Sequence, residues 1–340
     1  MAMSKRACGR WMKRRAHAER LKTVRQAPER KTCQHIMQAE QPRLAEVPNS
    51  GWDERLCLFR AGNEVDTSVL VTQRYLVIID TMATPELADA IVESVRALLA
   101  GRQLLAINTH ADYDHCWGNA AFASPVGAYP APIIAHEQAG VRMQSNEARQ
   151  YLAQRQQAEA RFASVRLVAP TITVTTGLRI DGGDLTLELL PTPGHTEDHI
   201  SIWIPELRLL LPGDAAEHPF PYVEEAKTLP TLRRSLARLA ALDAATVMPC
   251  HGGTTDSALI TRNLAYFDEV ERRGRSALAS GLVPPDWRER ADIAEIIGLP
   301  FAQAAKESGA DPASIPEFYR SVHLAAVRAM LTNLQMPDGE

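Results

Sequence analysis

The stretch LLAINTHADYDHCWGN, residues 104–119, decides how this chain folds and what it can bind. Its first five residues form an apolar run that predicts a buried β-strand, and a polar loop follows directly. That loop places four imidazole or carboxylate side chains within six residues, namely His110, Asp112, Asp114 and His115. These groups bind divalent zinc, iron and manganese, so the loop is a candidate site for two metal ions, with a solvated turn as the alternative interpretation.

Three further polar residues also follow strand-like runs: His195 in TPGH, Asp214 in LPGD and His251 in MPCHGG. In each case a Pro or Gly beside the polar residue fixes or frees the backbone where the strand turns into a loop. The repeated arrangement argues against a solvated turn and adds three candidate ligands to the first four.

Short apolar runs alternate with longer helical patterns from about residue 52. Strands are predicted at residues 68–72, 75–80, 104–108, 132–136, 199–204, 207–211 and 246–249, and DGGD from Asp181 predicts a hairpin turn. Helices are predicted from Pro85 to Gly101, over residues 137–162, after Pro230, and from residue 255 to the end.

Five motifs occur in order across roughly residues 52–262: LVIID ending in Asp80, THADYDH, TPGHTEDH, LLLPGDA and MPCHGG. This series resembles the metallo-β-lactamase-fold superfamily. The resemblance implies an α/β fold, a four-layer αββα sandwich with extra C-terminal helices. It also implies a binuclear site, in which His110, Asp112 and His195 bind one metal, Asp114, His115 and His251 bind the other, and Asp214 bridges both.

The first motif departs from the common H-x-H-x-D-H form, because Asp112 stands where the second histidine is expected. A carboxylate is a harder ligand than imidazole, so the exchange moves the metal preference from zinc toward iron or manganese. Two divalent ions are expected, with zinc favoured and iron or manganese allowed by Asp112. The departure also resembles the di-iron branch of the superfamily, the flavodiiron proteins.

The resemblance favours a metal-dependent hydrolase. We expect a two-metal-activated hydroxide to cleave an ester, lactone, thioester or amide-like bond, with Asp114 and Asp214 as catalytic residues. A di-iron oxidoreductase is one alternative, although the segment after residue 262 is too short and too helical for a flavodoxin-like domain. A non-catalytic metal-binding member is the other, and seven intact ligand positions argue against it because a structural ion needs only four.

Composition sets the remaining expectations. The net charge of the chain is -4, but residues 1–36 contain eleven Lys or Arg against Glu19 and Glu29, a local charge of +9. We expect residues 1–45 to be a basic, disordered leader, 46–262 the catalytic domain, and 263–340 a helical extension packed on that domain.

The expected partner is a small-molecule substrate, with no nucleic acid and no membrane expected. The odd cysteine count without C-x-x-C spacing suggests a reducing, cytoplasmic location.

Other residues near the motifs receive structural interpretations. Asp80 is expected to be a structural carboxylate beside the site. His199 is interpreted as a packing or surface residue, with a hydrogen-bonding role near the metals as the alternative. Cys116 and Cys250 adjoin candidate ligands, and their side chains are expected to turn away from the metals.

Overall fold

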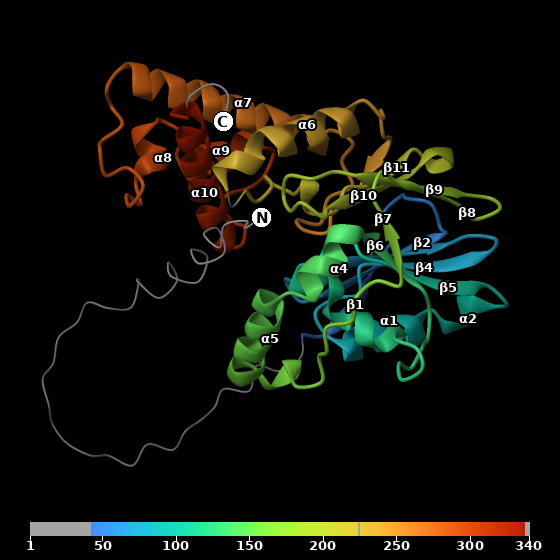
Figure 1. The fold of residues 1–340 in the computed structure, drawn as a ribbon. Coiled ribbons are helices and arrows are strands. Elements are labelled where there is room, and N and C mark those ends of the chain that lie inside the picture. The colour runs from blue at the N-terminus through green and yellow to red at the C-terminus, as the bar shows by residue number, and fades with distance from the viewer. Residues whose placement is uncertain (1–41, 224, 337–340) are drawn as a thin grey trace, which may run out of the picture. The chain divides into compact units, whose positions relative to one another are not determined.

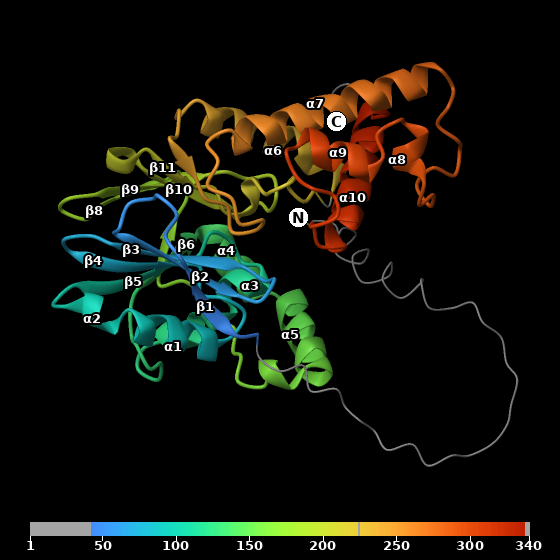
Figure 2. The ribbon, with the colours of Figure 1, turned by 180° about the vertical axis from the view of Figure 1, so that it is seen from behind.

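Two β-sheets lie face to face between outer layers of helices, as Figures 1 and 2 show from opposite sides. The computed structural model describes residues 42–223 and 225–336. Within them the architecture is the four-layer α/β sandwich that the resemblance implied. Most of the expected leader, residues 1–41, lies outside the described residues. The first sheet begins at Leu44, slightly before the expected start of the catalytic domain at residue 46.

The first sheet contains seven strands of the described chain in sequence order. Strands β1 to β4 are antiparallel neighbours, and β4 to β7 run parallel. Their bounds are β1 (Leu44–Val47), β2 (Leu56–Ala61), β3 (Asp66–Val71), β4 (Tyr75–Ile79), β5 (Gln103–Ile107), β6 (Ile133–His136) and β7 (Ile172–Val174).

The second sheet contains five described strands in the order β12-β11-β10-β9-β8. All pairs are antiparallel except β11 with β12, which run parallel. Their bounds are β8 (Leu178–Asp181), β9 (Thr186–Pro191), β10 (Ile200–Ile204), β11 (Leu209–Leu211) and β12 (Thr246–Val247).

The alternation of side chains along each strand produces the layers. In β4, Val77 and Ile79 are buried in the core between the two sheets. Their neighbours Leu76 and Ile78 point the other way and pack with α1. In β11, Leu210 packs with the helices on the outer face of the second sheet. The sheets therefore have apolar side chains on both faces, and each needs a helical layer to cover its outer face.

The helices divide between these outer layers and the edge that carries the predicted ligands (Figures 1 and 2). Helix α1 lies against the first sheet, while α6, α7 and α10 share a core with the second. Their bounds are α1 (Pro85–Ser94), α2 (Arg96–Leu99), α3 (Tyr113–Cys116), α4 (Glu137–Met143), α5 (Asn146–Ala158), α6 (Leu229–Ala240), α7 (Leu259–Ala279), α8 (Ile293–Ile296), α9 (Phe301–Glu307) and α10 (Phe318–Leu334). None of the described helices is long and apolar enough to cross a membrane.

Two helix boundaries differ from the sequence prediction. The single helix predicted at residues 137–162 is divided, because Ser145 caps a new helix by accepting a hydrogen bond from the N–H of Ala148. Helix α7 begins at Leu259, so the expected boundary after residue 262 divides one continuous helix.

The shared core predicts that the C-terminal helices and the sandwich unfold together. Phe267 on α7 is fully buried in the cluster that also contains Leu210 of β11. We expect Phe267→Ala to lower the free energy of unfolding of the whole chain by about 3 to 5 kcal/mol in denaturant titrations. Leu282→Ala, at a side chain that is 61% exposed, is the matched control and should change it little. A separate early transition for the helices, with the sandwich transition unmoved, would contradict this.

Candidate metal centre

All the predicted ligands follow the carboxyl ends of strands that finish at one edge of the sandwich. Because β4 and β5 are parallel, Asp80 and His110 leave the first sheet at the same edge. In the second sheet, β9 and β11 both run antiparallel to β10, and β12 runs parallel to β11. The loops after β9, β11 and β12, which contain His195, Asp214 and His251, therefore also leave together.

One carboxylate oxygen of Asp214 lies at the middle of this arrangement. Its Oδ2 atom is 3.7 Å from Nε2 of His110 and 3.3 Å from Nε2 of His115. The same oxygen is 3.6 Å from Nε2 of His195 and 3.4 Å from Nε2 of His251. Four imidazole nitrogens from three loops thus surround a single oxygen, and all four lie slightly beyond ordinary hydrogen-bond distance.

The other two aspartates lie on either side of Asp214. Asp112 Oδ2 is 3.5 Å from Nε2 of both His110 and His195. Asp114 Oδ2 is 3.6 Å from Nε2 of His251, and its Oδ1 is 3.8 Å from Nε2 of His115. The structure therefore brings all seven predicted side chains together. Six of them form two groups, each with ligand atoms within 4.8 Å of one another: group one is His110, Asp112 and His195, and group two is Asp114, His115 and His251. Asp214, the seventh, lies between the two groups.

The buried polar atoms of these groups fit a metal site. Among the described residues, Nε2 of His110, His115 and His195 and Oδ1 of Asp214 are buried without a hydrogen-bond partner. Such atoms are rare in folded proteins because each loses its hydration without replacement. Cations bound between them would satisfy these atoms together.

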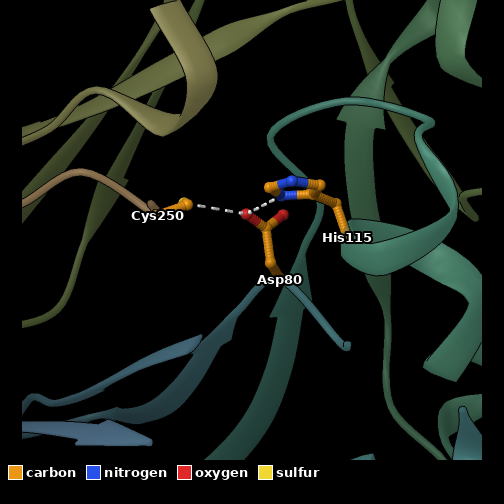
Figure 3. Close-up of side chains that lie close together, drawn as sticks. All are labelled: Asp80, His115 and Cys250. Carbon is orange, nitrogen blue, oxygen red and sulfur yellow. Dashed lines mark hydrogen bonds and ion pairs between the residues drawn. The ribbon is translucent and has the colours of Figure 1, made fainter. Parts of the chain in front are cut away.

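Asp80 holds the first loop in place and orients one of these imidazoles. It is fully buried, and its carboxylate accepts hydrogen bonds from the N–H of Thr109 at 2.7 Å and from Nδ1 of His115 at 2.8 Å. Figure 3 shows the ring of His115 above Asp80, with the sulfur of Cys250 on the other side of the carboxylate, at 3.4 Å from Oδ2. Because Nδ1 is engaged, Nε2 of His115 is directed toward Asp214. The Cys250 sulfur faces Asp80, and its adjacency to His251 in sequence does not make it part of either group.

His199 corrects the packing or surface interpretation made from sequence. It is fully buried, its Nδ1 lies 2.8 Å from the Thr192 hydroxyl, and its Nε2 accepts the Asp214 N–H at 3.0 Å. Gly213 makes this contact possible, since its φ is +57° and a Cβ at that position would lie only 2.6 Å from Nε2 of His199. His199 therefore fixes the backbone of the central aspartate.

Three acidic or basic side chains at the site were missed in the sequence. Glu217 is buried near His195 and Asp214, and it accepts a hydrogen bond from the hydroxyl of Tyr319 on α10 at 2.8 Å. Arg142 on α4 and Asp198 form an ion pair beside Asp112. Asp198 lies within the quoted motif TPGHTEDH, so proximity to His195 was its available signal. Glu217 lies three residues after Asp214 and had the same kind of signal, whereas Arg142 had none.

The comparisons with known proteins show the family of the chain. A model of the metallo-beta-lactamase superfamily matches residues 61–251, which is more than half of the 340 residues. The chain belongs to the metallo-beta-lactamase superfamily. The matched segment starts in β2 and ends at His251, so it contains all seven residues of the candidate centre.

Individual relatives of this superfamily member are distant. A beta-lactamase-like protein 2 homolog from Caenorhabditis elegans is 35% identical over 99 residues, which are 29% of this chain and 32% of the relative. The chain thus matches about a third of that protein's length. A metallo-beta-lactamase family protein from Thermus thermophilus is 20% identical with a TM-score of 0.55, covering 86% of this chain and 92% of that one. A sec-alkylsulfatase from Pseudomonas sp. is 18% identical with a TM-score of 0.57, covering 88% and 51%. Both structures show the shared fold.

Two imidazoles of the candidate centre hold a proton more strongly than an ordinary histidine does. Burial lowers the pKa of His195, but Asp112 and Asp214 more than offset this and raise it to about 9. Burial likewise opposes the charge of His251, and Asp214 raises its pKa to about 10. Metal ions bound here would therefore displace protons from both imidazoles near neutral pH.

These pKa values give a signed prediction for the metal-free protein. Both exceed the ordinary histidine value of 6.5, so protonation stabilises the fold fully below pH 6.5, and this stabilisation is lost as the pH rises through 9 and 10. We expect urea titrations of protein treated with a chelator to show that the free energy of unfolding falls from about pH 6.5 to 10. The fall is at most about 1.4 kcal/mol for each unit by which the pKa of a histidine is raised. Protein with added zinc should not show this fall, because metal binding strengthens as protons leave. A flat or rising curve for chelated protein would contradict the assignment.

Proposed function

We propose that this superfamily member is a metal-dependent hydrolase that acts on an ester, lactone, thioester or amide-like bond of a small-molecule substrate. Members of the superfamily are typically metal-dependent hydrolases, and the sec-alkylsulfatase is one of the structural neighbours. The observation that carries the proposal is the set of four Nε2 atoms around Asp214 Oδ2, from 3.3 to 3.7 Å. Two divalent ions bound by groups one and two, with Asp214 shared, would use every one of these atoms.

The chain's own residues would divide the work as follows. Two bound divalent ions supply a lowered pKa for a water molecule and polarisation of the substrate oxygen. Asp114 has one oxygen near each imidazole of group two, so its carboxylate can orient the attacking water. Asp214 keeps the two groups at a fixed separation, and His199 keeps Asp214 in place through its backbone N–H.

The C-terminal helices would complete the catalytic domain. Asn263 on α7 accepts the Glu217 N–H at 3.1 Å, and Tyr319 on α10 donates to the Glu217 carboxylate. The loop after Asp214 is therefore held by side chains from both helices, which supports the expected packing of the helical extension on residues 46–262. The described cysteines Cys57, Cys116 and Cys250 are free thiols, which supports a reducing, cytoplasmic location.

Removing a central ligand should abolish turnover without unfolding the chain. We expect His110→Ala and Asp214→Ala to reduce kcat/KM by at least about a thousandfold on whichever substrate the wild type hydrolyses, with an unchanged circular dichroism spectrum. Asp286→Ala, at a carboxylate that is 65% exposed, is the control and should retain full activity. Retained turnover in either ligand variant would exclude the proposed site.

Metal analysis of the protein purified without chelators or added metal tests the reaction class. We expect about two metal ions per chain by elemental mass spectrometry, with zinc or manganese and turnover on one class from a panel of esters, lactones, thioesters, phosphodiesters and β-lactams. About two iron ions, with oxygen or nitric oxide reduction and no hydrolysis, would favour a di-iron oxidoreductase instead. No bound metal would exclude both.

A further inference from the structure

The carboxylate of Asp112 is shared between group one and an arginine. Its Oδ2 atom lies 3.5 Å from the Nε2 atoms of His110 and His195. Its Oδ1 atom accepts a hydrogen bond from Nη2 of Arg142 at 2.6 Å. The arginine therefore occupies one oxygen and leaves the other directed into the group.

The other terminal nitrogen of Arg142 is also hydrogen-bonded. Its Nη1 donates to Oδ1 of Asp198, whose side chain is fully buried. The other oxygen of Asp198 accepts the N–H of Ala111 at 2.8 Å. Ala111 lies between His110 and Asp112 in sequence, so Asp198 ties the guanidinium to the backbone between two predicted ligands.

The charge of Arg142 persists throughout the accessible pH range. An arginine guanidinium stays protonated in proteins and cannot titrate under ordinary conditions. A guanidinium is planar and holds two acceptors in a fixed geometry, which an ammonium group does not. Arg142 thus offers both a fixed direction and a fixed positive charge to the carboxylate that replaces the usual histidine.

Helix α4 is also attached to the chain by residues other than this arginine. Ala139, Gly140 and Met143 are buried on the same helix and pack it against the chain. Val141 is 61% exposed, so α4 has a separate solvent-facing side. The two ion pairs of Arg142 are therefore additional to the apolar contacts of the helix, and one of them ends on a predicted ligand.

We propose that Arg142 is the positioning residue that lets Asp112 serve as a single-oxygen metal ligand in the place of a histidine. By holding Oδ1, it keeps the carboxylate from turning both oxygens toward one ion, and its positive charge, shared with Asp198, partly offsets the two carboxylates beside it. The proposal rests on the metal site of the proposed function, and it assigns to Arg142 a role in the affinity of group one alone.

Metal titration of the full-length protein by calorimetry tests this directly. The wild type should bind two zinc ions, and Arg142→Met should weaken one of them by about 10- to 100-fold while leaving the other unchanged. Arg142→Lys should restore only part of the loss, since lysine cannot hold Asp112 and Asp198 in one fork. Arg161→Met is the matched control, because Arg161 is also only partly exposed and pairs with two carboxylates, Glu64 and Glu159, outside both groups.

The exchange Asp112→His separates positioning from a general effect on folding. An imidazole has no carboxylate oxygen for Arg142 to hold. In the Asp112→His background, Arg142→Met should therefore change zinc affinity less than about twofold. Should Arg142→Met fail to fold because Asp198 is left buried and charged, Arg142→Met with Asp198→Asn removes that charge and is titrated in its place.

The outcomes distinguish this inference from the proposed function. A wild type that binds no metal would overturn the metal site itself. Two zinc ions in the wild type with unchanged affinities in Arg142→Met would overturn only the role of Arg142. An equal loss of affinity with and without the Asp112→His exchange would also overturn it, since Arg142 would then act by packing alone.

Discussion

The close approach of four buried imidazole nitrogens to one oxygen of Asp214 is the constraint on which the rest of this structure depends. At 3.3 to 3.7 Å these atoms interact strongly, yet His110, His115 and His195 leave their Nε2 atoms without hydrogen bonds. Positive charge must enter such a group, either as metal ions or as protons on the imidazoles. The raised pKa values of His195 and His251 show that, without metal, these imidazoles take up this positive charge as protons.

The fold keeps these groups close by fixing the residues behind them. Parallel strands β4 and β5 bring Asp80 next to the first loop, and the buried Asp80 then orients His115 through Nδ1. His199, immediately before β10, accepts the N–H of Asp214. The candidate ligands, which include both carboxylates that repel one another and imidazoles that attract them, are thus held at the ends of strands. We therefore expect substitutions of the residues that hold the ligands, such as Asp80 and His199, to change metal affinity as well as stability.

Much of this was predictable from the sequence because the ligands follow strand ends and lie in short motifs. His110 to His115 span six residues, and a buried strand precedes them. The role of His199 was misjudged, since nothing in its spacing shows that its ring would meet the Asp214 backbone. Arg142 was missed for a related reason. Arg142 lies thirty residues from Asp112, and only the packing of α4 on the loop brings them together.

The pairing of Arg142 with Asp112 also changes what the departure from the common motif means. Taken alone, an aspartate in place of a histidine adds a negative charge and a harder ligand to group one. The guanidinium at 2.6 Å adds a positive charge beside Asp112, but it also pairs with the buried Asp198, so the three groups together keep one formal negative charge. A carboxylate oxygen whose partner oxygen is held by a cation is also a weaker donor than a free carboxylate. The positive charge beside Asp112 and its weaker donor oxygen therefore make the expected shift from zinc toward iron or manganese smaller than Asp112 alone implies.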